Sequence, residues 1–288
     1  DVKAVNVGTS GIIDISNATT ITSSITTDVL EIVNNTGATF VTNANYVVTL
    51  SDTASASDVN TIVNDTSGIV TATVTADSAS NLNTALVNAT ATDALSLTIS
   101  GTSAVASDLI ALDGKTSVSI DTDTNVNTIT GTATDIQAVL TTSGIDTATD
   151  VDVIVDSGSA TVAQQQSIDA ATNGIITATI VEGDVTSLKT LTTSGVTDHA
   201  LTIVITDTSA SATDLIAIDG KTSVNVDASA ITDITSSAIA DVKTLITNAT
   251  TAGIDSNWNV VISDTSVSAA DVKAVNVGTS GIIDISNA

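Results

Sequence analysis

The sequence contains no cysteine, proline or methionine, and it has one tryptophan, one tyrosine and one phenylalanine. Without cysteine the chain has neither a disulfide framework nor a thiolate metal site. Its one histidine, His199, leaves zinc binding and histidine- or cysteine-based catalysis almost without the side chains that they need. We therefore expect no enzyme, a core of Val, Ile, Leu and Ala, and a solvated turn around His199.

Positive charge is also scarce, because the chain has six Lys and Arg residues but 32 Asp and Glu residues, which gives a net charge of −26. Nucleic acids and anionic membrane surfaces bind basic proteins, so neither is an expected partner. The sequence has no apolar run of about 18 residues, and we expect no membrane insertion. Such an acidic surface attracts divalent cations diffusely.

The first 18 residues, DVKAVNVGTSGIIDISNA, return unchanged as residues 271–288. A perfect copy at this distance is typical of a tandem array, and internal repeats decide the fold. We expect residues 1–288 to be a single repeat-array segment, in which 271–288 begins the next 270-residue period.

Short β-branched runs bounded by turn residues recur along the whole chain, and their length and composition predict strands. These runs are 12–16, 46–50, 69–75, 95–100, 118–121, 151–156, 175–181, 201–206, 224–227 and 260–263. A second β-like patch follows some of them, at 19–22, 128–130 and 232–235. Between the runs, apolar residues at helical spacing predict helices, as in 135–140 and 241–246.

Helix starts carry a capping pattern in which Ser or Thr precedes Asp by three residues. The pairs are Ser55 with Asp58, Thr132 with Asp135, Ser211 with Asp214, and Ser268 with Asp271. At the predicted helix ends we expect left-handed glycines, which are Gly68, Gly114, Gly144, Gly174, Gly195 and Gly220.

Helix-start positions divide one period into ten strand–helix units, and these units are grouped into larger blocks that repeat. The positions are Asp1, Asp28, Asp58, Asn81, Asp108, Asp135, Gln164, Ser187, Asp214, Asp241 and Asp271. The segment DLIALDGKTSV at 108–118 returns as DLIAIDGKTSV at 214–224. Internal four-unit blocks therefore cover about 28–134 and 135–240.

Strands that alternate with helices imply parallel pairing through crossover connections. With units this short, we predict an α/β solenoid of about ten strand–helix coils per 270-residue period, with one continuous parallel sheet. Because several units carry a second β-like patch, a right-handed parallel β-helix is the alternative fold.

The DLIAIDGKTSV and ITDIT units resemble the Thr/Ser/Asp-rich tandem repeats of giant bacterial, particularly cyanobacterial, cell-surface and extracellular filament proteins. This resemblance covers the whole chain and concerns the pattern of its repeats and its composition, without a diagnostic motif. It implies an extracellular or cell-surface location and a structural or adhesive role. The Gly/Asp nonapeptide calcium repeat of many such proteins is missing here.

One segment has the alternating oxygen ligands of a calcium loop, at Asp121, Asp123 and Asn125. It lacks the glycine and the final glutamate of an EF-hand, since Val126 and Thr132 occupy those positions. Ca²⁺ is thus the one candidate cofactor, and a polar turn is the alternative interpretation. The Gly-Lys-Thr sequences at 114–116 and 220–222 lack the first glycine of a phosphate-binding loop, and we interpret both as helix ends.

Together these features predict a structural repeat unit of a long extracellular filament or giant surface protein, which assembles by coil-on-coil stacking. Its expected partners are copies of itself, through chain continuation or end-to-end stacking. The alternative is an adhesive or cation-bridged surface-binding module, and binding of ice or another ligand through threonine arrays such as Thr71 and Thr73 is a lesser one.

Overall fold

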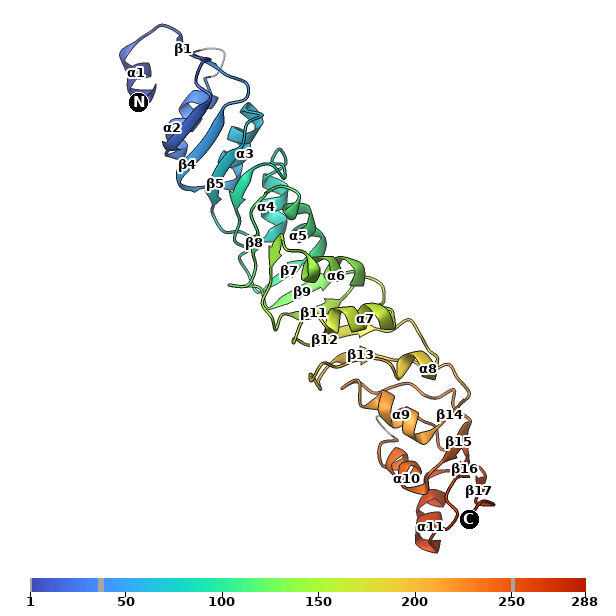
Figure 1. Ribbon diagram of the computed structural model, residues 1–288. Coiled ribbons are helices and arrows are strands. Elements are labelled where there is room, and N and C mark those ends of the chain that lie inside the picture. Colours follow the sequence, from blue (N-terminus) through green and yellow to red (C-terminus); the bar gives the residue numbers. More distant parts are fainter. Residues whose placement is uncertain (1, 36–38, 250–251) are drawn as a thin grey trace. The chain divides into compact units, whose positions relative to one another are not determined.

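The computed structural model describes residues 2–35, 39–249 and 252–288, and it is an α/β protein in which helices alternate with parallel strands (Figure 1). It divides into two compact lobes. The first lobe comprises Asp1–Ile129 and Ala138–Ala148, and the second comprises Thr130–Gln137 and Thr149–Ala288. The predicted α/β class and parallel strand pairing are confirmed. The expectation of one continuous sheet is wrong for the described residues, because their strands form five separate parallel sheets.

Eleven helices lie in the described residues, and all of them are shorter than three turns, with at most 10 residues. They are α1 (Val2–Gly8), α2 (Thr26–Val33), α3 (Ala56–Asp65), α4 (Ala79–Ala85), α5 (Ala106–Asp113), α6 (Ala133–Thr141), α7 (Val162–Asp169), α8 (Val185–Leu188), α9 (Ala212–Asp219), α10 (Ile239–Thr247) and α11 (Ala269–Gly278). Helices this short are marginal alone and depend on tertiary packing.

The predicted helix starts are confirmed, because from Asp28 to Asp271 each predicted position is the third residue of a helix. Asp1 lies outside the described residues. The capping pattern is confirmed as well: the Ser55, Thr132, Ser211 and Ser268 hydroxyls accept from the backbone N–H three residues on. In α7 the Thr161 and Gln164 side chains form a complete capping box.

The strands follow the helices singly or in pairs. They are β1 (Ile13–Ile15), β2 (Thr20–Ser24), β3 (Phe40–Thr42), β4 (Val47–Ala54), β5 (Val70–Val74), β6 (Ala94–Ser96), β7 (Ser103–Val105), β8 (Ile120–Asp121), β9 (Thr128–Gly131), β10 (Ile145–Asp146), β11 (Asp152–Val155), β12 (Ile176–Thr179), β13 (Ala200–Thr202), β14 (Ser209–Ala210), β15 (Asp233–Ser237), β16 (Asn259–Ile262) and β17 (Ile283–Asp284). We call one helix with the strand or strands that precede it a repeat, so that each repeat ends with its helix.

The three second β-like patches form strands, which are β2, β9 and β15. One predicted strand is wrong, because 224–227 contributes only an isolated parallel bridge between Val204 and Asp227. The Asp227 carboxylate accepts from Ser229 N at 3.1 Å and from Ser229 Oγ at 2.7 Å. This local turn ends the extended backbone, as expected for an Asp that bonds two residues on.

Neighbouring strands come from successive repeats. In the first lobe the order is β2-β4-β5-β6, with Thr20 beside Val47 and Val48 beside Val70. The second lobe contains β11-β12-β13 and β14-β15-β16-β17. Figure 1 shows α9, α10 and α11 in succession beside β15, β16 and β17. Each repeat thus covers the one before it.

The core consists of β-branched and leucine side chains from the inward positions of the strands and helices. In β4 and β5 buried and more exposed residues alternate, as expected when one strand face packs inward. Phe40, Tyr46 and Trp258 are all buried. Each of these large side chains immediately precedes or begins a strand.

The expectation of left-handed glycines at helix ends is wrong for most of the six positions. Among them Gly195 has a positive φ, of 90°, whereas Gly114 and Gly220 are right-handed C-caps with φ near −70°. Gly68 and Gly174 instead lie where a Cβ would come within 2.3 Å of Tyr46 O and 2.2 Å of Val151 O, which immediately precede β4 and β11. Glycine is needed there for close approach between repeats.

Candidate functional site

The predicted calcium-loop residues lie at the end of β8 and in the turn after it. The Asp121 carboxylate accepts from Thr124 N at 3.3 Å and from Thr124 Oγ1 at 3.0 Å. Asn125 Nδ2 donates to Ile99 O at 3.1 Å, and Asp123 is exposed. Asp121 and Asn125 therefore hold local structure, and calcium binding at this turn stays a prediction.

The two Gly-Lys-Thr sequences end α5 and α9, as interpreted, and their threonines belong to a recurring joint. We define this threonine joint as a threonine that follows a helix, donates to a carbonyl in or immediately before a strand of the preceding repeat, and accepts from the N–H two residues on. The donor–acceptor pairs are Thr66–Tyr46 O, Thr116–Leu95 O, Thr172–Val151 O, Thr222–Leu201 O and Thr279–Trp258 O. Each joint fastens a repeat to its predecessor.

A second contact fastens five of the repeats to their successors. The first N–H of five helices donates to a side chain 20 to 26 residues further on, in the following repeat. The pairs are Thr26–Asp52, Val162–Glu182, Val185–Asp207, Ala212–Ser237 and Ile239–Asp264. We call this contact the following-repeat cap. It satisfies an N–H that no intrahelical carbonyl reaches.

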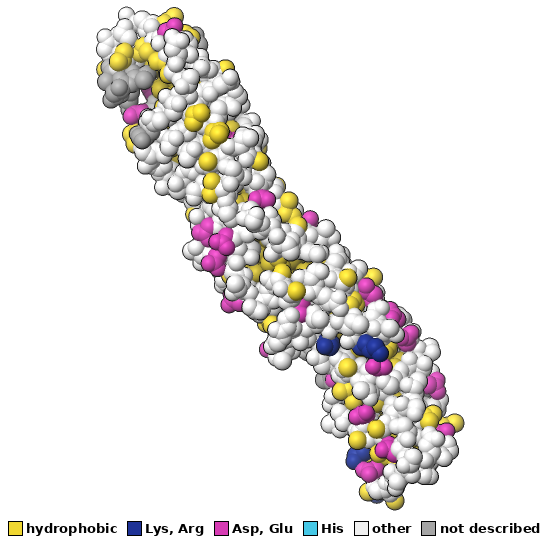
Figure 2. All heavy atoms as spheres, viewed as in Figure 1, with side chains coloured by type: hydrophobic (Ala, Val, Ile, Leu, Met, Phe, Trp, Pro, Cys, Tyr) yellow, Lys and Arg dark blue, Asp and Glu magenta, His cyan; other side chains and the backbone are white. Residues whose placement is uncertain are grey.

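Polar side chains also connect consecutive helices. Lys243 Nζ donates to Asp271 Oδ1 at 2.6 Å, and Lys189 Nζ donates to Asp214 Oδ1 at 3.4 Å. The hydrogen bond from Lys243, with a second from Ser268, lowers the pKa of the Asp271 carboxyl. Figure 2 shows acidic side chains spread over the drawn face with few lysines among them.

The expectation of a solvated turn around His199 is wrong, because this side chain is fully buried. Its Nδ1 accepts from Ile176 N at 3.0 Å, which requires that atom to carry no proton. Its Nε2 lies 2.9 Å from Asp169 Oδ1, and Asp169 accepts from Ser194 Oγ at 2.7 Å. The histidine therefore donates to Asp169 and holds β12 in place.

The internal duplication explains the position of His199. In the first block Val70 N donates to Asp93 Oδ1 at 3.0 Å, and Asp93 is buried as His199 is. Val70 and Asp93 stand 106 residues before Ile176 and His199, the same offset as between Asp108 and Asp214. Two different acceptors thus perform one structural task. Ser194 contacts Asp169 rather than the imidazole, so these residues do not form a nucleophile–base pair.

The identical terminal segments have different surroundings, which makes them the most informative site in the chain. We call residues 1–18 the N-terminal copy and residues 271–288 the C-terminal copy. Val5 is 54% exposed, whereas the equivalent Val275 is fully buried. Thr9 is exposed, whereas Thr279 is buried and forms a threonine joint with Trp258 O. The preceding repeat thus covers the C-terminal copy.

The N-terminal copy is covered on its other side. Asn6 Nδ2 donates to Glu31 Oε1 at 2.9 Å, and Ile13 N donates to Thr39 O at 2.8 Å. β1 pairs with β3, and α1 contacts α2. The following repeat provides all these contacts, and it is the neighbour that the C-terminal copy lacks among the described residues.

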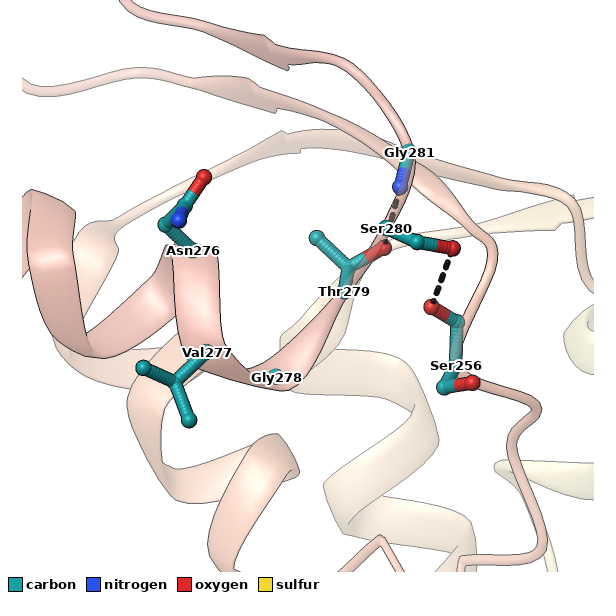
Figure 3. Close-up of a pocket in the computed structure, with 7 residues that line it drawn as sticks. All are labelled: Ser256, Asn276, Val277, Gly278, Thr279, Ser280 and Gly281. Carbon is teal, nitrogen blue, oxygen red and sulfur yellow. Dashed lines mark hydrogen bonds between the residues drawn. The ribbon is translucent and has the colours of Figure 1, made fainter.

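A hollow of about 440 Å³ marks this side of the C-terminal copy. Asn276, the equivalent of Asn6, lines it together with residues 277–281 and Ser256 (Figure 3). In Figure 3 the Asn276 side chain extends into the open space beside the 278–281 turn, while Val277 points away from it. The arrangement offers an amide donor at an open surface.

The described residues contain no group of three or more His, Asp and Glu side chains arranged to hold a metal ion. No helix in the described ranges has the length and hydrophobicity that crossing a bilayer requires. Comparison with protein-family models, with curated proteins and with solved structures finds no match to this chain.

Proposed function

We propose that this chain is a structural repeat module of a long extracellular filament or giant surface protein, and that its repeats stack as an α/β solenoid. One observation carries the proposal, which is the contrast between the two identical 18-residue segments. The C-terminal copy is covered by the residues before it, whereas the N-terminal copy is covered by the residues after it. Such a segment is suited to a neighbour on both sides.

The contacts between repeats support stacking as the assembly mechanism. Threonine joints reach back to the preceding strand, and following-repeat caps reach forward. Along the chain these contacts connect repeats in both directions, while Val, Ile and Leu side chains form the core. In arrays of this kind stability is approximately a sum of repeat and interface contributions.

The proposed location and the absence of catalysis come from composition. The resemblance to repeats of bacterial surface proteins supports an extracellular or cell-surface site. The polar network around His199 is structural, and we assign the chain no enzymatic activity. The additional β-like patches form the strands β2, β9 and β15, and they support the parallel β-helix as the alternative form of the proposed solenoid.

Electron microscopy of the purified chain tests the filament proposal. Ten repeats with strands roughly 4.8 Å apart predict an axial spacing of about 48 Å, or a simple multiple of it. We expect linear end-to-end assemblies with this spacing. Discrete particles of uniform size at every protein concentration contradict the proposal.

A cation-bridged adhesive module is the second candidate, and the net charge of −26 favours it. Divalent cations bridge acidic surfaces that otherwise repel each other. In this case association of the chain depends steeply on Ca²⁺ and is reversed by a chelator. Assembly that is equal in Ca²⁺ and in chelator excludes the cation-bridged mechanism and leaves stacking.

A further inference from the structure

We propose that Asn173 is a site of spontaneous deamidation, and that the threonine joint beside it controls the reaction. Asn173 and Gly174 form the one Asn-Gly pair of the sequence. In such a pair the backbone nitrogen of the glycine attacks the side-chain carbonyl carbon of the asparagine, and a cyclic imide forms. Glycine has no Cβ to obstruct this attack, so Asn173 is the asparagine of this chain that reacts most readily once its backbone is free.

The Asn-Gly pair stands where the other threonine joints carry serine. Serine is the next residue in four joints, which are those at Thr66, Thr116, Thr222 and Thr279. The joint at Thr172 has Asn173 instead. Ser67 N donates to Ala44 O at 2.9 Å, and Asn173 N donates to Thr149 O at 2.8 Å. The exchange of Ser for Asn therefore keeps the backbone contact and adds a carbon that a nitrogen can attack.

The nitrogen that must attack is held out of the reaction in the folded chain. Gly174 is buried, and its N–H donates to Thr172 Oγ1 at 3.0 Å. Thr172 is buried as well, and its hydroxyl in turn donates to Val151 O at 2.7 Å. The nitrogen can attack only after it has lost its proton, and here that proton points to a buried hydroxyl. The closed joint therefore blocks the first step.

The next two N–H groups hold the same segment from both sides. Ile175 N donates to Asp152 Oδ1 at 2.7 Å in the preceding repeat, and Ile176 N donates to His199 Nδ1 at 3.0 Å in the following repeat. Together with the two N–H groups before them, four consecutive amides are hydrogen-bonded. Asn173 is exposed, so the carbon under attack meets solvent and the attacking nitrogen does not. Deamidation therefore requires a local opening of this repeat.

The reaction proceeds in two steps once the joint opens. Gly174 N loses its proton to water and bonds to Asn173 Cγ, while the bond from Cγ to Nδ2 breaks and the leaving nitrogen takes up a proton and departs as ammonia. Water then adds to one of the two imide carbonyl carbons. Addition at Cγ gives aspartate. Addition at the backbone carbonyl carbon gives isoaspartate, in which the main chain runs through the side chain and contains an additional CH₂ group.

The two products differ in whether the joint can close again. Aspartate keeps the native backbone, and its new carboxylate faces solvent because Asn173 is exposed. Isoaspartate lengthens the main chain beside Gly174, where even a Cβ would clash with Val151 O and Asp150 O. This close packing leaves no room for the additional CH₂ group, so the threonine joint does not re-form. Formation of isoaspartate thus makes a local opening irreversible.

The experiment follows deamidation of the full 288-residue chain at neutral pH, folded and in concentrated urea. Liquid chromatography with tandem mass spectrometry measures the rate at residue 173 and separates aspartate from isoaspartate. We expect Asn173 to react at least about tenfold more slowly in the folded wild type than in urea, because only the open state reacts. Thr172→Val removes both hydrogen bonds of the joint hydroxyl and should accelerate the reaction of the folded chain about tenfold. In urea the two chains should react equally fast.

The matched controls come from the equivalent joint in the first lobe. Thr66→Val breaks that joint and should leave the rate at Asn173 unchanged. Ser67→Asn places a second Asn-Gly pair there, which should be protected in the folded chain and lose its protection when Thr66→Val is added. A measurement on the wild type alone supports these variants: as urea is raised below the unfolding midpoint, the deamidation rate should rise in proportion to hydrogen exchange of the 173–176 amides.

The possible outcomes are distinct. A folded wild type that deamidates at Asn173 as fast as the chain in urea overturns the proposal, and so does a chain in which Asn173 reacts in neither state. Equal acceleration by Thr66→Val and Thr172→Val shows that global unfolding sets the rate, which also overturns it. Protection in the folded chain that Thr172→Val removes and Thr66→Val leaves intact establishes the joint as the control.

Discussion

At Gly281 the backbone of one repeat passes so close to the preceding strand that a Cβ would lie 2.2 Å from Trp258 O. The equivalent Gly11 has Thr9 Oγ1 at 3.5 Å as its nearest neighbour, an ordinary contact. Both glycines belong to the same 18-residue sequence. Their difference arises entirely from the neighbouring repeat, and it makes the effect of one repeat on another measurable at a single residue.

Alanine at these two positions tests this explanation. Gly281→Ala forces the turn away from β16 and should lower the stability of the C-terminal repeats by about 1–3 kcal/mol, as overpacking does. Gly11→Ala should change stability by less than about 0.5 kcal/mol. Urea unfolding of the two variants measures the difference. Equal losses in both show that glycine is needed here for another reason.

Sequence patterns predict local features of this chain well, since helix starts depend on residues a few positions apart. Ser268 and Asp271, for example, identify the start of α11 without knowledge of the fold. The burial of His199 escaped prediction because its partners, Ile176 and Asp169, lie 23 and 30 residues away. The 106-residue duplication offered a signal, since Asp93 occupies the equivalent position. The calcium turn, at Asp121, remains a prediction.

At the scale of the element, the short helices depend on side chains outside themselves. Asp52, in β4, accepts from both Thr26 N and Thr26 Oγ1 at 2.8 Å. The hydrogen bonds from Thr26 hold the pKa of this carboxyl below its usual value of 3.8. The folded state therefore favours ionised Asp52, and a strand of one repeat stabilises the helix of the repeat before it.

The lowered pKa of Asp52 determines the direction of a pH effect. Its contribution to stability is complete above about pH 4 and is lost as the pH falls through the folded-state value, because the folded chain then takes up a proton against the Thr26 bonds. At low pH the other carboxylates are also protonated, which reduces the repulsion between them and raises the free energy of unfolding. Asp52→Asn removes the titrating group, so the difference between wild type and variant isolates it.

We expect the free energy of unfolding of the wild type to exceed that of Asp52→Asn at pH 7, and the gap to narrow as the pH falls below about 4. Chemical denaturation at a series of pH values measures this gap. Asp123 is exposed, and Asp123→Asn serves as the control with little effect at pH 7. A gap that does not depend on pH rules out the carboxylate as the source of the stabilisation.

At the scale of the whole molecule, contacts connect each repeat mainly to its neighbours. The strand order within each lobe follows the order of the repeats, as β2-β4-β5-β6 and β14-β15-β16-β17 show. Damage in one repeat should therefore spread to adjacent repeats and fade with distance along the chain. This expectation differs from that for a globular domain with one cooperative core.

Ile203, after β13, is 1% exposed, and Ile203→Asp introduces an unpaired charge among apolar neighbours. We expect new protease cleavage sites in the repeats around β12 and β13, while β4 and β5 in the first lobe keep their protection. Limited proteolysis with mass-spectrometric mapping measures this pattern. Cleavage throughout the chain at one common rate contradicts nearest-neighbour coupling.

The following-repeat caps give synthesis of the chain a direction. The first N–H of α2 finds Asp52 26 residues later, and that of α10 finds Asp264 25 residues later. As the polypeptide leaves the ribosome, each of the five capped helices is made before its acceptor. At these points the growing end stays unfinished until the next repeat has been made.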